Sequence, residues 1–378
     1  MKKSLIALAA LGAIAGSSAS ADELKFYGLV SAGVVSGSGI GNAEKSQTVM
    51  SDQGHSSNRW GFMGSEDLGG GMKAKFQLES NLSLRSGGAG KDSGGTTKNG
   101  DPLFDREANV SLESKEWGQI KLGRGKNFLY NVLDEYDSRG NWNFGGMKAV
   151  ARYAGFYGGS GVSRYDNMVR YSSPSFDGLS FDYAYSFGGD LTDSTKSNKW
   201  NVGARYEKEN FGIAYTHSDN KISSTDINNR IDLLAGRYTM GDWYFDAGYA
   251  MTRNPAGTGA FTAQAAATTK VDNKPDADTY FIGARYKLND KVGLNGGYYN
   301  VKDKTSGATG ADDLQMVAVG MTYSFSKRTE FYVDYASAIR KSNAAAAFTL
   351  FDRYSDGSNT FESAANQNAV NVGIQHRF

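Results

Sequence analysis

The sequence predicts an all-β protein, a 16-stranded antiparallel transmembrane β-barrel with short turns at one end and long loops at the other. Three observations favour this fold. Apolar and polar residues alternate with a period of two in segments of about ten residues, as they do in strands. The apolar side of these segments is rich in Tyr, Trp and Phe, which gather where membrane strands leave the bilayer. The breaks between segments alternate between short and long.

The composition excludes several other classes. The 378 residues include 48 Gly and 12% aromatic residues but no Cys, so neither a disordered chain nor a disulfide scaffold fits. Lys and Arg number 41 against 40 Asp and Glu, and no block of like charge marks a nucleic-acid interface. We therefore expect no nucleic-acid partner, and a single domain rather than the two or three that the length alone suggests.

The first 21 residues have the pattern of a signal peptide. Met1–Lys3 is positively charged, Leu5–Ala15 is apolar, and Ala19-Ser20-Ala21 fits a cleavage site. The apolar run is too short to cross a bilayer as a helix, which takes about 20 residues. We expect residues 1–21 to be removed on export, leaving residues 22–378 as the barrel domain.

Sixteen segments carry the strand pattern. In one of them Trp243, Phe245 and Tyr249 share one face, and Asp246 and Gly248 lie on the other. A soluble sandwich would also alternate, but with compact aliphatic residues on its inner face. The expected strands span residues 23–35, 57–66, 72–83, 104–113, 117–126, 164–173, 178–187, 198–208, 210–220, 228–240, 242–253, 277–288, 290–302, 313–325, 328–341 and 367–378.

One segment breaks the alternation. Within 228–240, Ile231 and Leu233 fall on one face and Leu234 and Tyr238 on the other, although all four are apolar. A β-bulge inserts an extra residue and turns the following side chains to the opposite face. We therefore expect a bulge or a displaced strand end in this segment.

The breaks between strands point to a membrane barrel. Short breaks alternate with long ones at 36–56, 84–103, 127–163, 188–197, 221–227, 254–276, 303–312 and 342–366. An even number of strands of about ten residues, with tight turns on one side and long loops on the other, is the pattern of bacterial outer-membrane barrels. A sheet in lipid must close on itself because lipid offers no hydrogen-bond partners to its edges. The four prolines all lie in breaks, where a missing N–H does no harm.

Seven local motifs stand out along the chain: Leu24–Gly33, Asn58–Ala74, Phe76–Glu79, Leu103–Val110, Leu122–Arg124, Tyr171–Phe176 and Gly373–Phe378. Together they resemble those of the Gram-negative general porins of the β-proteobacterial type, over essentially the whole mature chain. The last motif ends in Phe378, the terminal aromatic residue that such barrels present to the barrel-assembly machinery.

The resemblance implies a function and an assembly. It implies a homotrimer in the outer membrane, in contact with membrane lipid and lipopolysaccharide, that passes small hydrophilic solutes and ions by passive diffusion. It also implies that the third long loop, here 127–163, folds inward and narrows the channel. The turns would then be periplasmic and the loops extracellular.

Alternation places several charged residues on the inner wall. Arg59 lies opposite Trp60 and Phe62, and the same rule turns three further wall residues inward: Lys75, Arg164 and Arg170. Glu79 is an inward carboxylate. Charged side chains at a water-filled constriction determine the ion selectivity of a channel, so these residues are candidates for the constriction.

Two arginines resist the alternation rule. Arg106 and Arg124 share parity with apolar residues and would face lipid, where Arg costs about 2–4 kcal/mol at mid-membrane. Either a bulge intervenes or these strands face another subunit; the resemblance makes both of them pore arginines. On the inward loop, Asp134 and Asp137 are the candidate carboxylates. Six basic candidates against three acidic ones predict a preference for anions.

Other functions have weaker support. The three histidines, His55, His217 and His376, stand in no catalytic or metal-binding motif, so we expect no enzyme, metal or cofactor. A substrate-specific porin for sugars or organic acids would use an aromatic row on the inward loop, for which the candidates are Tyr130, Tyr136, Trp142 and Phe144. A non-conducting barrel would instead display adhesin-like loops at 84–103, 254–276 and 342–366.

Overall fold

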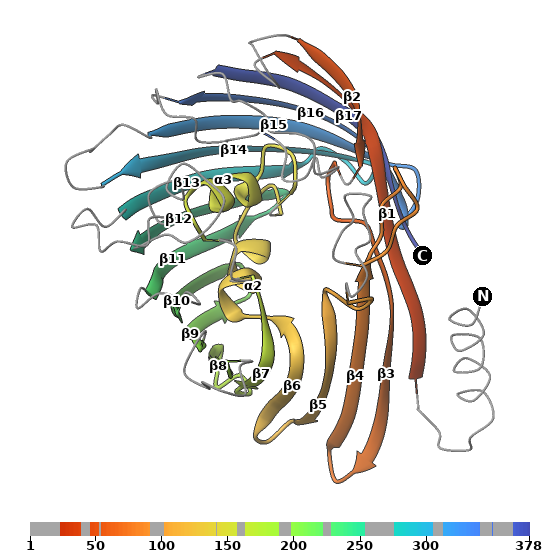
Figure 1. Cartoon of the computed structure of the whole chain (residues 1–378), viewed down its shortest axis with the longest axis vertical. Coiled ribbons are helices and arrows are strands. Elements are labelled where there is room, and N and C mark those ends of the chain that lie inside the picture. Colours follow the sequence, from red (N-terminus) through yellow and green to blue (C-terminus); the bar gives the residue numbers. More distant parts are fainter. Residues whose placement is uncertain are drawn as a thin grey trace.

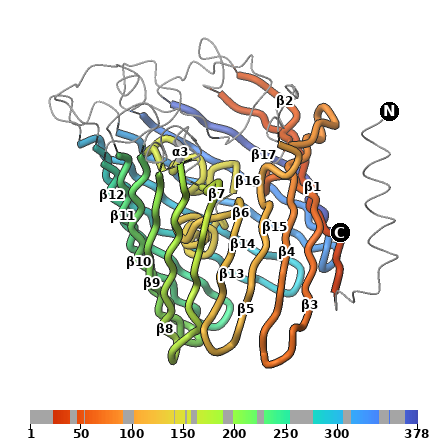
Figure 2. The backbone as a smooth tube through the Cα atoms, turned by 60° about the horizontal axis from the view of Figure 1, so that its bottom comes forward, coloured from red at the N-terminus to blue at the C-terminus, as the bar shows by residue number. Residues whose placement is uncertain are grey.

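The computed structural model shows a barrel of antiparallel strands with two helices inside it (Figures 1 and 2). It describes residues 23–38, 46–52, 54–90, 102–140, 142–156, 163–188, 198–221, 228–253, 276–304, 313–340, 350 and 366–378. The predicted signal peptide lies outside the described residues. No helix among the residues described is long and apolar enough to cross a membrane.

In the described part of the chain, seventeen strands form the wall, and each is joined to its neighbours by hydrogen bonds. Helices α2 (Phe128–Glu135) and α3 (Met147–Tyr153) lie between β6 and β7 in the sequence. The strands are β1 (Glu23–Ser38), β2 (Gln47–Asp52), β3 (Arg59–Gly69), β4 (Met72–Asn81), β5 (Glu107–Ser114), β6 (Gly118–Lys126), β7 (Arg164–Ser172), β8 (Leu179–Ser186), β9 (Lys199–Lys208), β10 (Phe211–Lys221), β11 (Asn228–Met240), β12 (Trp243–Arg253), β13 (Asp276–Lys287), β14 (Val292–Asp303), β15 (Leu314–Ser324), β16 (Thr329–Arg340) and β17 (Asn366–Arg377).

The sheet closes between its first and last strands. β1 pairs with β17 along one edge, and along the other edge it pairs first with β3 and then with β2. β2 and β3 are therefore two pieces of one wall position, which makes sixteen positions and confirms the predicted 16-stranded antiparallel barrel. The sequence pattern missed β2, because it lies within the long break expected at 36–56.

The seam depends on a glycine. Gly28 and Phe378 exchange two backbone hydrogen bonds of 3.0 Å each. The Phe378 ring covers Gly28, and a Cβ at that position would lie 2.1 Å from the ring. The ring also packs against Phe26, with 5.6 Å between the ring centroids. A side chain larger than hydrogen at Gly28 would push the Phe378 ring away from its place over the seam.

The expectation of a bulge or a displaced strand end in 228–240 is wrong. β11 keeps an unbroken register with both β10 and β12. Ile231 and Leu233 face inward and are fully buried in the same cluster as residues of α3, whereas Leu234 faces outward and is 48% exposed. Both faces of β11 are apolar because one meets the membrane and the other meets the loop folded into the barrel. Alternation fails wherever the inner face is dry.

Candidate pore constriction

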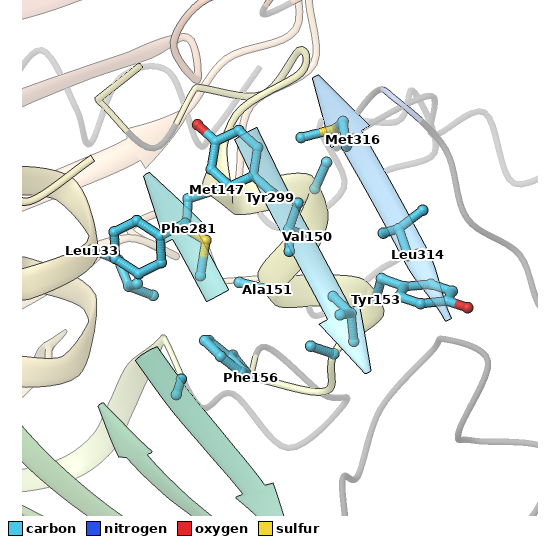
Figure 3. Close-up of a cluster of buried hydrophobic side chains, with 14 of the residues drawn as sticks. Leu133, Met147, Val150, Ala151, Tyr153, Phe156, Phe281, Tyr299, Leu314 and Met316 are labelled. Carbon is cyan, nitrogen blue, oxygen red and sulfur yellow. The ribbon is translucent and has the colours of Figure 1, made fainter. Parts of the chain in front are cut away.

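The inward loop is held against one side of the barrel by an apolar cluster. Met147, Val150 and Tyr153 of α3 pack with Tyr299 of β14 and Met316 of β15 (Figure 3), and each is at most 2% exposed. Burial of large side chains contributes about 1.5–3 kcal/mol each. This side of the loop is therefore a small hydrophobic core between loop and wall.

Asp137 fastens the turn that joins the two helices. Its carboxylate accepts a hydrogen bond from the Tyr299 hydroxyl at 2.7 Å and from the backbone N–H groups of Arg139 and Met147 at 3.2 Å each. Asp137 is 1% exposed. The predicted constriction carboxylate is therefore placed in the contact between loop and wall, not at an open surface.

A second polar contact joins the loop to β16 and to the segment before β3. Arg139 Nη2 donates to Asp334 Oδ1 at 3.0 Å, and His55 Nε2 lies 2.8 Å from Asp334 Oδ2. The His55 ring is stacked between Trp142 and Tyr332, with centroid distances of 3.6 and 3.8 Å. The side chains of Arg139, Asp334 and His55 are fully buried. We call these five residues the Asp334 clamp.

Three wall arginines hold the first half of the loop. Arg285 donates to the carbonyl oxygens of Ser138 and Asp137 at 2.5 and 2.6 Å. Arg205 pairs with Glu135 at 2.5 Å. Arg237 pairs with Glu207, which also accepts a hydrogen bond from the Tyr136 hydroxyl. The three guanidinium groups lie over the aromatic rings of Tyr244, Phe128 and Tyr136, respectively, at 4.7–5.7 Å from the ring centroids.

The opposite part of the wall carries a charged cluster around Glu79. Arg106 Nε donates to Glu79 Oε1 at 2.5 Å, and Arg59 Nε lies 3.7 Å from Oε2. The Tyr27 hydroxyl donates to Oε2 at 3.0 Å. Glu79 and Arg106 are each 5% exposed, whereas the Arg59 side chain is 29% exposed. One carboxylate thus joins two arginines on the inner wall.

Helix α2 presents Tyr130 and Asp134 to further cations. Arg164 and Lys126 lie over the Tyr130 ring at 5.1 and 4.8 Å from its centroid. Lys126 Nζ also pairs with Asp134 Oδ2 at 2.7 Å, and both side chains are about one-third exposed. Arg164 Nε lies 3.9 Å from Glu107, but its Nε and Nη2 atoms have no hydrogen-bond partner among the described residues.

The electrostatic balance around Tyr130 is positive. Burial and Asp134 raise the pKa of the Tyr130 phenol, whereas Lys148, Arg164 and Lys126 lower it, and the net shift is downward. Arg59 and Arg106 also act on this ring. We call the group the constriction cluster: the cations Arg59, Arg106, Lys126, Lys148 and Arg164 and the acids Glu79, Asp105, Glu107 and Asp134. These five cations outnumber the four acids.

Comparison with known proteins identifies the family. The family model described as Gram-negative porin matches residues 7–344. This chain belongs to that family. An outer membrane porin protein of Bordetella pertussis is 27% identical over 428 aligned residues, and outer membrane porin protein 32 of Delftia acidovorans is 27% identical over 384; both alignments cover 100% of each chain. This porin is therefore an outer-membrane channel protein and not an enzyme.

Solved structures show the same fold. An anion-selective porin from Comamonas acidovorans superposes with a TM-score of 0.76 at 20% identity, covering 94% of this chain and 99% of that one. OmpF of Salmonella typhi, solved in complex with daunomycin, gives a TM-score of 0.61 at 20% identity, covering 94% and 97%. At these identities the likeness concerns the fold.

The porin brings three of the six basic candidates together: Arg59, Arg106 and Arg164. Arg106 precedes β5, so strand alternation does not apply to it. The other three, Lys75, Arg124 and Arg170, have partners elsewhere on the wall: Lys75 with Glu113 at 2.6 Å, Arg124 with Asp166, and Arg170 with Asp182 at 2.7 Å.

Arg124 lies at an irregularity of the sheet. The register of β6 against β7 shifts between Gly123 and Gly125. A bulge of this kind is one of the two explanations given above for the fact that strict alternation would turn Arg124 toward lipid. Its Nε donates to the Asp105 carbonyl at 2.6 Å. Sequence reasoning missed Lys126, Arg205, Arg237 and Arg285 as contacts of the loop, and Lys148 as a charged residue of the loop itself. Arg205 and Arg285 lie on the inward side of clear strand alternations, which is the signal that could have found them, whereas Arg237 lies in the segment 228–240, where both faces are apolar.

Proposed function

We propose that this porin is a general diffusion channel for small hydrophilic solutes and ions, with a preference for anions. The observation that carries the proposal is the constriction cluster, which holds five cations and four acids beside a loop that occupies the barrel. Charges that line a narrow aqueous passage focus the potential and raise the local concentration of counter-ions. The solved porin of similar fold from Comamonas acidovorans is described as anion-selective, which agrees with this preference.

The aromatic side chains of the loop favour a general channel over a substrate-specific one. Tyr136 and Phe144 are fully buried and Tyr130 is 6% exposed. Trp142 stacks on His55 in the Asp334 clamp. Rings that are packed in this way present little surface to a passing sugar. The loops that an adhesin would display lie mostly outside the described residues.

Single-channel recording in a planar bilayer under a KCl gradient tests the proposal. We expect a reversal potential that favours Cl⁻, and conductance in three equal steps from a homotrimer. Uptake of neutral sugars should fall smoothly with their size, without saturation. A saturable pathway for one solute would favour the substrate-specific alternative, and a folded barrel without conductance would favour the display alternative.

Exchange of Arg59 and Arg124 for Ser tests the basic side chains. We expect the reversal potential to move toward K⁺ because two positive charges leave the inner wall. An unchanged reversal potential would contradict their assignment to the pore.

Assembly follows the same proposal. We propose that residues 1–21 are removed on export and that Phe378 is read by the barrel-assembly machinery. Deletion of Phe378 should reduce the amount of folded porin in the outer membrane, whereas Phe378→Tyr should retain it. The mass of the mature chain tests the cleavage site directly.

A further inference from the structure

A row of polar residues crosses the inner wall on the short-turn side of the constriction cluster. Lys75, Ser111, Lys121 and Arg170 are consecutive Cα partners across β4, β5, β6 and β7. Lys75 lies four residues from Glu79 along β4, a distance of about 13 Å. Lys121 faces inward, since its neighbours Ile120 and Leu122 are 41% and 48% exposed on the outer face.

The charges in this row are unevenly neutralised. Lys75 pairs with Glu113 at 2.6 Å. Arg170 pairs with Asp182 through its Nε and Nη2 atoms at 2.7–3.0 Å. Within the described part of the chain, no hydrogen bond or ion pair engages the Lys121 ammonium. Lys121 is therefore the cation of this row that no carboxylate pairs with directly, and Glu107 and Asp182 act on it only from beyond ion-pair distance.

A hollow of about 280 Å³ opens beside this charge. Lys75, Ser111, Gln119 and Lys121 line it. The Ser111 hydroxyl accepts a hydrogen bond from Gln119 Nε2 at 3.2 Å, which leaves its own proton to donate. Glu23, on β1, closes the far end of the hollow and lies four strand spacings from Lys121, about 19 Å. The basic end thus offers an ammonium and a hydroxyl donor.

We propose that Lys121 and Ser111 form a binding subsite for a small oxyanion, such as a carboxylate, sulfate or phosphate. The subsite rests on the proposed function and deepens it, because it gives an anion leaving the constriction cluster a second place to pause. An oxyanion there accepts from the ammonium and from the hydroxyl at once, which a chloride ion does less well. The Lys75 ammonium, which is paired with Glu113, lines the same hollow without adding net charge.

The test measures how sulfate reduces the chloride current through single porin channels. Added sulfate should reduce the current with a defined half-blocking concentration. Lys121→Gln should raise that concentration about fivefold, the effect of one exposed ion pair of about 1 kcal/mol. Lys121→Arg should leave it nearly unchanged. Lys73→Gln is the matched control, because Lys73 lies on the same inner face of β4 but does not line the hollow.

The outcomes separate the subsite from the channel function. An equal loss of block in Lys73→Gln and Lys121→Gln would mean a diffuse field and overturn the subsite. Crystals soaked in selenate give a readout that needs no conduction, and we expect anomalous density beside the Lys121 ammonium. Such density in a barrel that does not conduct would support the subsite and refute the proposed function. A conducting channel with neither block nor density would refute the subsite alone.

Discussion

The two flanks of the inward loop use charge in different ways. On the flank toward β13–β16, the ions that hold the loop are buried in pairs, as in Arg139 and Asp334 at 0% exposure. On the flank toward β3–β7, Arg59, Lys126 and Asp134 keep roughly a third of their side-chain surface in contact with solvent, beside the buried ions Glu79, Arg106 and Arg164. The first flank therefore fixes the position of the loop, and the second presents a field to the channel.

The free energies of buried and of partly exposed ions explain why the two flanks of the loop differ. A buried ion pair is strongly destabilised when one partner is lost, since the other charge stays in a medium of low dielectric. It therefore ties the loop to one position. Ions that keep about a third of their surface in solvent contribute little to stability because water and salt screen them. Their potential still reaches the solutes that pass within a Debye length.

Removal of the clamp carboxylate should have the largest effect. Asp334→Ala leaves Arg139 and His55 buried without their shared partner, and we expect a loss of about 3–5 kcal/mol in the free energy of unfolding. Urea unfolding of the purified barrel in detergent measures it. The loop should also lose its fixed position, so the single-channel conductance should change and become noisier. Wild-type stability together with wild-type conductance would contradict the role of the clamp.

Loss of one hydroxyl on the same flank should have an intermediate effect. Tyr299→Phe removes a donor from the buried Asp137 carboxylate and keeps the ring. A buried acceptor that loses a partner costs about 1–3 kcal/mol. Urea unfolding measures this change in the free energy of unfolding. The control is Tyr298→Phe, because the Tyr298 ring at the neighbouring position faces outward. Equal effects of the two substitutions would show that Asp137 does not depend on the wall.

Single arginine substitutions on the open flank should change selectivity and leave stability nearly unchanged. Arg59→Ser should lower the ratio of Cl⁻ to K⁺ permeability about twofold, or ~0.4 kcal/mol. Arg124→Ser should lower it less, because Arg124 is paired with Asp166 outside the constriction cluster. Reversal potentials of the two single variants measure the difference. A larger shift of the reversal potential in Arg124→Ser than in Arg59→Ser would contradict the proposed order of the two effects.

An exposed ion pair at the barrel end should have the smallest effect. Lys208 and Asp177 lie 2.5 Å apart, but the Asp177 side chain is 92% exposed. We expect Asp177→Ala to change the free energy of unfolding by less than about 0.5 kcal/mol and to leave the reversal potential unchanged. A change as large as that of Asp334→Ala would mean that burial does not separate the two kinds of ion pair.

Strand alternation predicted the wall well because lipid and water impose opposite demands on its two faces. The sixteen expected segments match the observed strand positions, with ends displaced by a few residues. The pattern failed where that contrast is missing. Ile231 and Leu233 of β11 face a dry interior, and in β2 the polar residues Gln47 and Thr48 and the apolar residue Met50 are all exposed.

The site was harder to predict because its contacts are distant in the sequence. Asp334 is 195 residues from Arg139 and 279 from His55, so no local motif brings them together. Parity identified Arg59, Glu79 and Arg164 as inward residues. It could not show that Asp137 would bind the wall while Lys126, next to the loop, would join the constriction cluster.

The most direct test compares two arginines that stack on aromatic rings on opposite flanks of the loop. Arg164 lies over Tyr130 on the open flank, and Arg285 lies over Tyr244 and holds the backbone of the loop. The reversal potential under a KCl gradient should move toward K⁺ in Arg164→Gln and stay near the wild-type value in Arg285→Gln. A shift confined to Arg285→Gln would contradict the division between a fastening flank and a charged one.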